Sequence, residues 1–205
     1  MSVQNKRSTV TLYSHPKCPY SHRVRIILAE KGVHFDVIDV DLNDKPDALL
    51  ELNPYGTVPT LMDRDLVAYE SNVIFEYLEE RFPHPPLLTV FPIERAQTRY
   101  LAKRIDEDWT RYLVSAMFGK TEQIVYGAKV ALVKELLSMI PAFTKHKYFM
   151  QEKYSIIDCM LSVILYRLPE LGITLPPRAE PIIEYAERVF SRPSFQHSIG
   201  NIEEL

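Results

Sequence analysis

The cysteine best placed for chemistry is Cys18, in the stretch His15-Pro-Lys-Cys-Pro-Tyr-Ser-His-Arg23. Pro19 suits the first position of a helix, because a residue there has no helical partner for its N–H. A cysteine directly before such a helix faces unpaired N–H groups and the positive end of the helix dipole, and its basic neighbours also favour thiolate. No second cysteine follows in a Cys-x-x-Cys arrangement, so redox chemistry would need a mixed disulfide with an external thiol. The alternative is a small residue that packs at a turn.

Two further pairs of residues are suited to binding a ligand. Val58-Pro59 opens a strand after the turn Asn53-Pro-Tyr-Gly56. A cis peptide bond there would turn the preceding backbone groups toward a ligand, whereas a trans proline would only begin an edge strand. Glu70-Ser71 stands at the expected start of a helix. Together with the helix N-terminus it could bind the amino and carboxylate ends of a small peptide, and the alternative is an ordinary helix cap.

Composition indicates a non-exported, cytoplasmic protein with a sizeable core. The chain has 205 residues, 46% of them hydrophobic, and Cys18 and Cys159 are its only cysteines. That number is too small for a disulfide framework and suits a reducing compartment. Residues 1–7 are not followed by the apolar stretch of a signal peptide, and no apolar run reaches membrane-spanning length. The net charge is -3 with basic residues scattered, so we expect no direct nucleic-acid binding and no membrane association. We identify no metal-ligand set.

The first part of the chain alternates strand and helix patterns. Apolar spacing and turn residues predict strands at 10–13, 35–40, 58–62 and 66–68, and helices at 19–32, 46–52 and 71–80. The last two strands flank Asp63-Arg-Asp65 and should form a hairpin. The order βαβαββα predicts a mixed sheet with helices packed on it.

The second part of the chain is predicted to be helical. Residues 1–83 form the expected first domain, 84–92 a proline-rich linker, and 93–205 an all-helical second domain. Helical periodicity covers roughly 93–118, 122–140, 155–168, 179–190 and 193–199. Ser155 and Asp158 match a capping box, and the apolar run that follows should be the buried axis of this domain, with Cys159 in its core.

Together these features resemble the glutathione transferase superfamily along essentially the whole chain. The resemblance rests on a strand, Cys-Pro-x-Ser, a helix, a Val-Pro strand, a hairpin, a Glu-Ser helix, a proline-rich linker and a helical half with Ser-x-x-Asp. It implies a fold of the α/β plus all-α class, with a thioredoxin-like N-terminal domain, a C-terminal helical domain and usually a homodimer. It also implies that Val58 offers backbone hydrogen bonds to glutathione and that Glu70-Ser71 holds its γ-glutamyl end.

One bacterial branch is more similar than the rest. The segments Tyr20–Gly32, Leu52–Pro54, Val58–Leu61, Tyr77–Leu87 and Tyr166–Ile173 resemble the stringent starvation protein A family. That resemblance implies association with RNA polymerase holoenzyme, altered promoter use under starvation and acid stress, and no established transferase activity or required cofactor. Members of this family commonly carry other residues where this chain has Cys18.

The expected partner-binding residues are Pro83, His84 and Pro85, with Tyr77 extending the patch. Proline restricts φ and removes backbone donors, so an exposed Pro-His-Pro segment is a preorganised surface. The alternative is that these prolines only stiffen a connector. Other transcription regulators are allowed as further partners. The competing function is a glutathione-dependent thiol transferase or dehydroascorbate reductase, in which Cys18 would be the catalytic residue and glutathione would bind at Val58, Pro59, Glu70 and Ser71.

Overall fold

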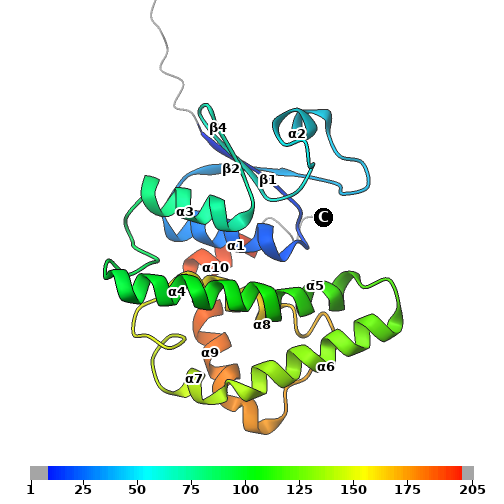
Figure 1. Ribbon diagram of the computed structural model, residues 1–205, viewed down its shortest axis with the longest axis vertical. Helices are drawn as coiled ribbons and strands as arrows, with labels where there is room; N and C mark the ends of the chain where they lie inside the picture. The colour runs from blue at the N-terminus through cyan, green and yellow to red at the C-terminus, as the bar shows by residue number, and fades with distance from the viewer. Residues whose placement is uncertain (1–8, 200–205) are drawn as a thin grey trace, which may run out of the picture. The chain divides into compact units, whose positions relative to one another are not determined.

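The computed structural model describes residues 9–199, which divide into two compact units (Figure 1). Of the described residues, unit 1 contains 9–85 together with 197–199. Unit 2 runs from Pro86 to Gln196. None of the helices within residues 9–199 is long and apolar enough to cross a membrane.

Unit 1 is built on a four-stranded mixed sheet in the order β2-β1-β3-β4. The strands are β1 (Val10–Ser14), β2 (Phe35–Asp39), β3 (Thr60–Asp63) and β4 (Leu66–Tyr69). The helices are α1 (Pro19–Glu30), α2 (Asp47–Leu52) and α3 (Ser71–Arg81). β2 runs parallel to β1, whereas β3 pairs antiparallel with both β1 and β4. The predicted order βαβαββα, the hairpin and the mixed sheet are therefore confirmed.

Both faces of this sheet are covered. Adjacent residues of β1 point to opposite faces, and both Leu12 and Tyr13 are buried. Tyr13 packs in a cluster with Val40 and Leu49 of α2. On the other side, α1 and α3 lie next to each other (Figure 1) and bury apolar side chains such as Ile27 and Ile74. The β1–α1 connection that carries Cys18 is therefore fixed by a strand and a helix that both belong to the core.

The last helix that the structure describes contacts α1. In α10 (Pro193–Ile199), the Ser198 hydroxyl lies 3.0 Å from Nε2 of His22, and the Ser198 carbonyl accepts a hydrogen bond of 3.1 Å from Nε of Arg25. His22 and Arg25 are both buried. These contacts explain why residues 197–199 group with the sheet and not with the helices that precede them.

Unit 2 is helical almost throughout. Its longer helices are α4 (Pro92–Arg104), α5 (Arg111–Phe118), α6 (Glu122–Ser138), α8 (Ile156–Tyr166) and α9 (Glu180–Phe190). Short α7 (Ile140–Thr144) and the 3₁₀ turn η2 (Pro177–Ala179) connect them. One prediction was wrong in detail, because residues 93–118 are not one regular helix. A π-helical segment, η1 (Ile105–Thr110), separates α4 from α5, and its wider turn buries both Ile105 and Trp109.

The predicted capping box begins α8. The Ser155 side chain and the Asp158 carboxylate satisfy N–H groups at opposite ends of the first turn. The same carboxylate accepts hydrogen bonds from the Phe149 N–H at 3.0 Å and from the Tyr185 hydroxyl at 2.6 Å. Every residue from Ile156 to Leu165 is buried, including Cys159. The prediction that this helix is the buried axis of the helical part is confirmed.

Candidate functional site

Cys18 occupies the N-cap position of α1, and Pro19 is at the start of the helix as predicted. The backbone of Cys18 is held by its N–H, which donates to the His15 carbonyl at 3.0 Å. Its side chain makes no capping hydrogen bond to α1. Instead, the half-buried Sγ lies 3.7 Å from the Val58 carbonyl oxygen. The thiol thus lies at a helix N-terminus and in contact with the backbone of the Val58-Pro59 segment.

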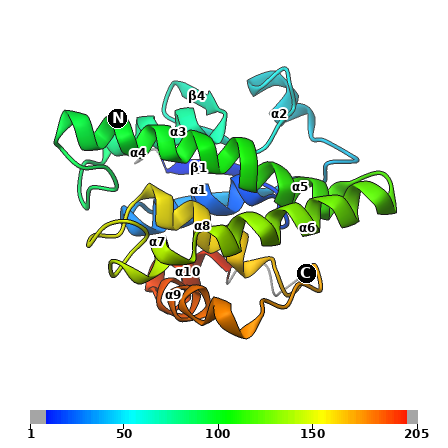
Figure 2. The same ribbon diagram turned by 60° about the horizontal axis from the view of Figure 1, so that its bottom comes forward.

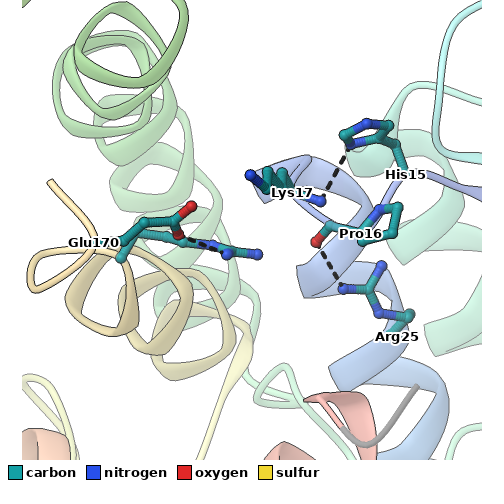
Figure 3. Close-up of polar contacts among 6 residues, drawn as sticks. His15, Pro16, Lys17, Arg25 and Glu170 are labelled. Carbon is teal, nitrogen blue, oxygen red and sulfur yellow. Dashed lines mark hydrogen bonds and ion pairs between the residues drawn. The ribbon is translucent and has the colours of Figure 1, made fainter. Parts of the chain in front are cut away.

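A polar network fixes the loop before Cys18 (Figure 3). Arg25 donates to the Ser14 hydroxyl at 2.6 Å and to the Pro16 carbonyl at 3.4 Å. The Lys17 N–H donates to Nδ1 of His15 at 3.1 Å, which requires a lone pair on that nitrogen. Burial lowers the pKa of His15 against the opposing effect of nearby aspartates. This role of His15 and Arg25 was not predicted from the sequence, although both residues lie within eleven positions of Ser14.

The Val58-Pro59 peptide bond is cis, which resolves the alternative left open by the sequence. The turn before it is stabilised by Asn53, whose side-chain amide donates to the Thr57 carbonyl at 3.2 Å and to the Thr60 hydroxyl at 3.0 Å. Asn53 is fully buried, so this turn is an integral part of the unit. The result is a backbone segment held firmly beside the Cys18 thiol.

Glu70 and Ser71 stand at the start of α3, but neither acts as a simple cap. Glu70 is the N-cap residue with φ of 68° and makes no side-chain capping bond. Its side chain is exposed. The Ser71 hydroxyl accepts a hydrogen bond from the guanidinium of Arg23, which also lies over the ring of Tyr20. The structure therefore places the Cys18 thiol in contact with the Val58 carbonyl, and it links Ser71 to α1 through Arg23. Within residues 9–199, no cluster of three His, Cys, Asp or Glu side chains could hold a metal ion.

The Pro83-His84-Pro85 segment is exposed, and a buried lysine side chain donates a hydrogen bond to its backbone. Its His84-Pro85 bond is cis. Nζ of Lys31, at the end of α1, donates 2.8 Å to the Pro85 carbonyl and lies 2.5 Å from a carboxylate oxygen of Glu79 in α3. The Lys31 side chain is fully buried and Glu79 is 5% exposed. A buried ion pair between two helices thus holds the backbone of an otherwise exposed loop.

Tyr77 lies on α3 before this segment, with its hydroxyl directed to β3. It donates a hydrogen bond of 2.6 Å to Asp63. Burial and the Asp63 carboxylate raise the pKa of Tyr77. Asp63 also lies 3.7 Å from the guanidinium of Arg81. Tyr77 is therefore linked to the sheet, and only part of its ring is available to a partner.

The ion pair drawn in Figure 3 belongs to unit 2. Arg167 binds Glu170 at 2.9 Å just after α8. Gly172 then takes φ of 68°, a left-handed conformation that glycine adopts readily, and the Ile173 N–H returns to the Leu168 carbonyl at 2.9 Å. The Tyr166–Ile173 segment therefore forms a compact helix terminus.

The fold is that of known glutathione transferases. Residues 12–86 match the family described as glutathione S-transferase, N-terminal domain. A glutathione transferase structure from Methylococcus capsulatus is 26% identical with a TM-score of 0.85, covering 96% of this chain and 100% of that one. Ure2p in complex with glutathione has a TM-score of 0.83 at 17% identity, covering 96% of this chain and 95% of that one, and that likeness concerns the fold alone. The class of protein is thus the glutathione transferase superfamily.

Similar sequences identify the family within this superfamily. A stringent starvation protein A homolog of Haemophilus influenzae is 47% identical, over 97% of this chain and 94% of its own length. The homolog of Coxiella burnetii is 46% identical, over 97% and 95%. A glutathione S-transferase omega-2 of Rattus norvegicus is 31% identical, over 80% and 67%. The chain belongs to the stringent starvation protein A family, as its sequence segments predicted.

Proposed function

We propose that this protein is a transcription regulator of the starvation and acid stress response that associates with RNA polymerase holoenzyme. It acts in the cytoplasm as a homodimer, without transferase activity or a required cofactor, and other transcription regulators are allowed as further partners. Membership of the stringent starvation protein A family supports this function. The observation that carries it is the exposed Pro83-His84-Pro85 segment held by the buried Lys31.

The physical argument concerns the cost of ordering a binding surface. A flexible loop loses conformational freedom when a partner binds it, and this loss weakens the complex. Here two prolines restrict the backbone, and the hydrogen bond from Lys31 to the Pro85 carbonyl fixes the end of the segment. The exposed imidazole of His84 is then displayed on a backbone that needs little further ordering. In a symmetric dimer, two such segments would bind a large partner more tightly than one.

The second candidate function is glutathione-dependent thiol transfer, and the contact between Cys18 and Val58 favours it. The Cys18 thiolate would attack the glutathione sulfur of a mixed disulfide and release the substrate as a thiolate. The first glutathione is then joined to Cys18 by a disulfide bond. The thiolate of a second glutathione would attack the sulfur of that bound glutathione, forming glutathione disulfide and restoring the Cys18 thiolate. The cis Val58-Pro59 bond and the exposed Glu70 carboxylate suit the binding of glutathione beside the thiol.

The two functions make opposite predictions for two sets of variants. We would measure retention of purified polymerase holoenzyme and glutathione-dependent thiol transfer with wild type, Cys18→Ser and the triple variant Pro83→Ala/His84→Ala/Pro85→Ala. An exposed-loop variant of unit 2, Lys145→Ala/Lys147→Ala, is the matched control.

The regulatory proposal expects polymerase retention by wild type, Cys18→Ser and the control, loss of retention only in the triple variant, and no turnover by any of them. Turnover that disappears in Cys18→Ser, with no polymerase retained by any variant, would instead establish the thiol transferase.

A further inference from the structure

Helix α6 of unit 2 carries apolar side chains on two faces. One face is buried in the unit and consists of Ala128, Leu132 and Leu136. The other face consists of Tyr126, Val130, Val133 and Leu137. Tyr126 is 72% exposed and Val130 50% exposed. An amphipathic helix on a protein surface normally has one apolar stripe, because its other face meets water. The outer stripe of α6 is therefore apolar surface that the described part of the chain does not fully cover.

This stripe forms the floor of a groove of about 760 Å³. The opposite wall is the segment Gly172–Thr174 between α8 and η2, which Figures 1 and 2 show in orange beside α6. Lys129 of α6 fixes this wall, because its Nζ donates a hydrogen bond of 2.6 Å to the Leu171 carbonyl. The groove is thus bounded by a helix and a tethered segment.

The rim of the groove is positively charged. Lys129, Lys134 and Arg178 line it. A smaller hollow of about 360 Å³, which shares Tyr126 and Lys129 with the groove, adds Lys120. Of the described residues that line the two hollows, Glu122 alone is acidic. Because the chain as a whole has a net charge of -3, this local excess of cations distinguishes the groove from the rest of the protein.

We propose that this groove, lined by α6 and residues 172–178, is a docking site for an acidic amphipathic helix of a partner protein. The apolar stripe accepts the apolar anchors of that helix, and Lys134 and Arg178 pair with carboxylates that flank them. Tyr126 and Leu137 are eleven residues apart on α6, and at 1.5 Å per residue the stripe is about 16 Å long. That length matches about three turns of a partner helix. The site is separate from the Pro83-His84-Pro85 segment and does not depend on its function.

The test uses a stapled, fluorescein-labelled helical peptide as probe, with Leu at i, i+4, i+7 and i+11 and Glu at the flanking positions. A second peptide has Lys in place of every Glu. Fluorescence anisotropy measures the binding of each peptide to wild type, to Lys134→Glu/Arg178→Glu, to Val130→Asp and to the matched control Lys153→Glu. All substituted side chains are exposed, so far-UV circular dichroism and thermal midpoints should stay unchanged.

Wild type and Lys153→Glu should bind the Glu peptide at least about tenfold more tightly than they bind the Lys peptide. Each groove variant should bind the Glu peptide at least about tenfold more weakly than wild type does. Binding to wild type should also weaken between about 50 and 500 mM salt. Equal affinity for both peptides, unchanged affinity in both groove variants, or no binding by wild type would overturn the proposal. A homodimer that Val130→Asp dissociates would assign the groove to a second copy of the chain. Wild-type binding to anionic phosphatidylglycerol vesicles but not to the Glu peptide would assign it to a lipid surface, and either result would overturn the proposal.

Discussion

The buried ion pair beneath the Pro-His-Pro segment provides a sharp test of the structure. Replacing Lys31 with methionine keeps an unbranched side chain that is one atom shorter, and removes the charge and the three donors of the ammonium group. Two contacts are lost at once, the one to the Glu79 carboxylate at 2.5 Å and the one to the Pro85 carbonyl at 2.8 Å. Both partners belong to unit 1, so the effect should appear in the stability of the folded protein and in the position of the segment.

The magnitude follows from the burial of this pair. Because Lys31 is fully buried and Glu79 is 5% exposed, water cannot readily replace the lost contact. Removing one member of such a pair lowers the free energy of unfolding by about 3–5 kcal/mol. For a chain of this size that loss corresponds to a drop in Tm of about 6–20 °C. The double variant Lys31→Met/Glu79→Leu removes both charges and should lose only about 1–3 kcal/mol, the cost of leaving the Pro85 carbonyl without this donor.

Urea unfolding monitored by far-UV circular dichroism measures both free energies, and an unchanged slope would show that the unfolding reaction is the same. The double variant is the more stable of the two and is therefore the better protein in which to measure polymerase binding. Its affinity for polymerase should be lower than that of wild type if the Lys31 hydrogen bond orders the segment. A single variant that loses less than about 1 kcal/mol, or a double variant that loses as much as the single one, would refute the reasoning.

Three other results are expected. Asp158→Ala should lower the free energy of unfolding by about 3 kcal/mol or more, since a helix cap and two buried donors lose their acceptor; chemical denaturation measures this, and a loss below about 1 kcal/mol would contradict the capping network. Because burial lowers the pKa of His15, its NMR titration midpoint should fall below 6.5, and its contribution to stability should be present above that pH and lost as pH falls below it; a midpoint above 6.5 would contradict its burial. Arg25→Met should make the C-terminus more susceptible to carboxypeptidase, because it removes the 3.1 Å hydrogen bond to the Ser198 carbonyl; unchanged cleavage kinetics would show that this contact does not hold α10.

Local signals in the sequence predicted the parts of the fold that depend on neighbouring residues. Pro19 marked the start of α1 and so placed Cys18 at its N-cap. Ser155 and Asp158 marked the start of α8 three residues apart. In each case the physical cause, a missing N–H or a reciprocal hydrogen bond, acts within one helical turn.

The rest depends on contacts between residues far apart in the chain. Lys31 and Glu79 are separated by 48 positions, and neither stands out in a sequence with many charged residues. The contacts of His22 and Arg25 with Ser198 span more than 170 positions. No periodicity encodes such a pairing, because it is decided by how the helices pack. The π-helical turn at Ile105–Thr110 was not predicted for a related reason, since its hydrogen bonds span five residues instead of the four of a regular helix and the apolar pattern hardly changes.

The measurement that tests the central claim most directly is the Kd of RNA polymerase holoenzyme for the immobilised protein, determined side by side for wild type and for Pro83→Ala/His84→Ala/Pro85→Ala. We predict saturable binding by wild type and an affinity at least about tenfold weaker for the triple variant, with unchanged thermal midpoints. Equal affinities, or no saturable binding by the wild-type protein, would contradict the account.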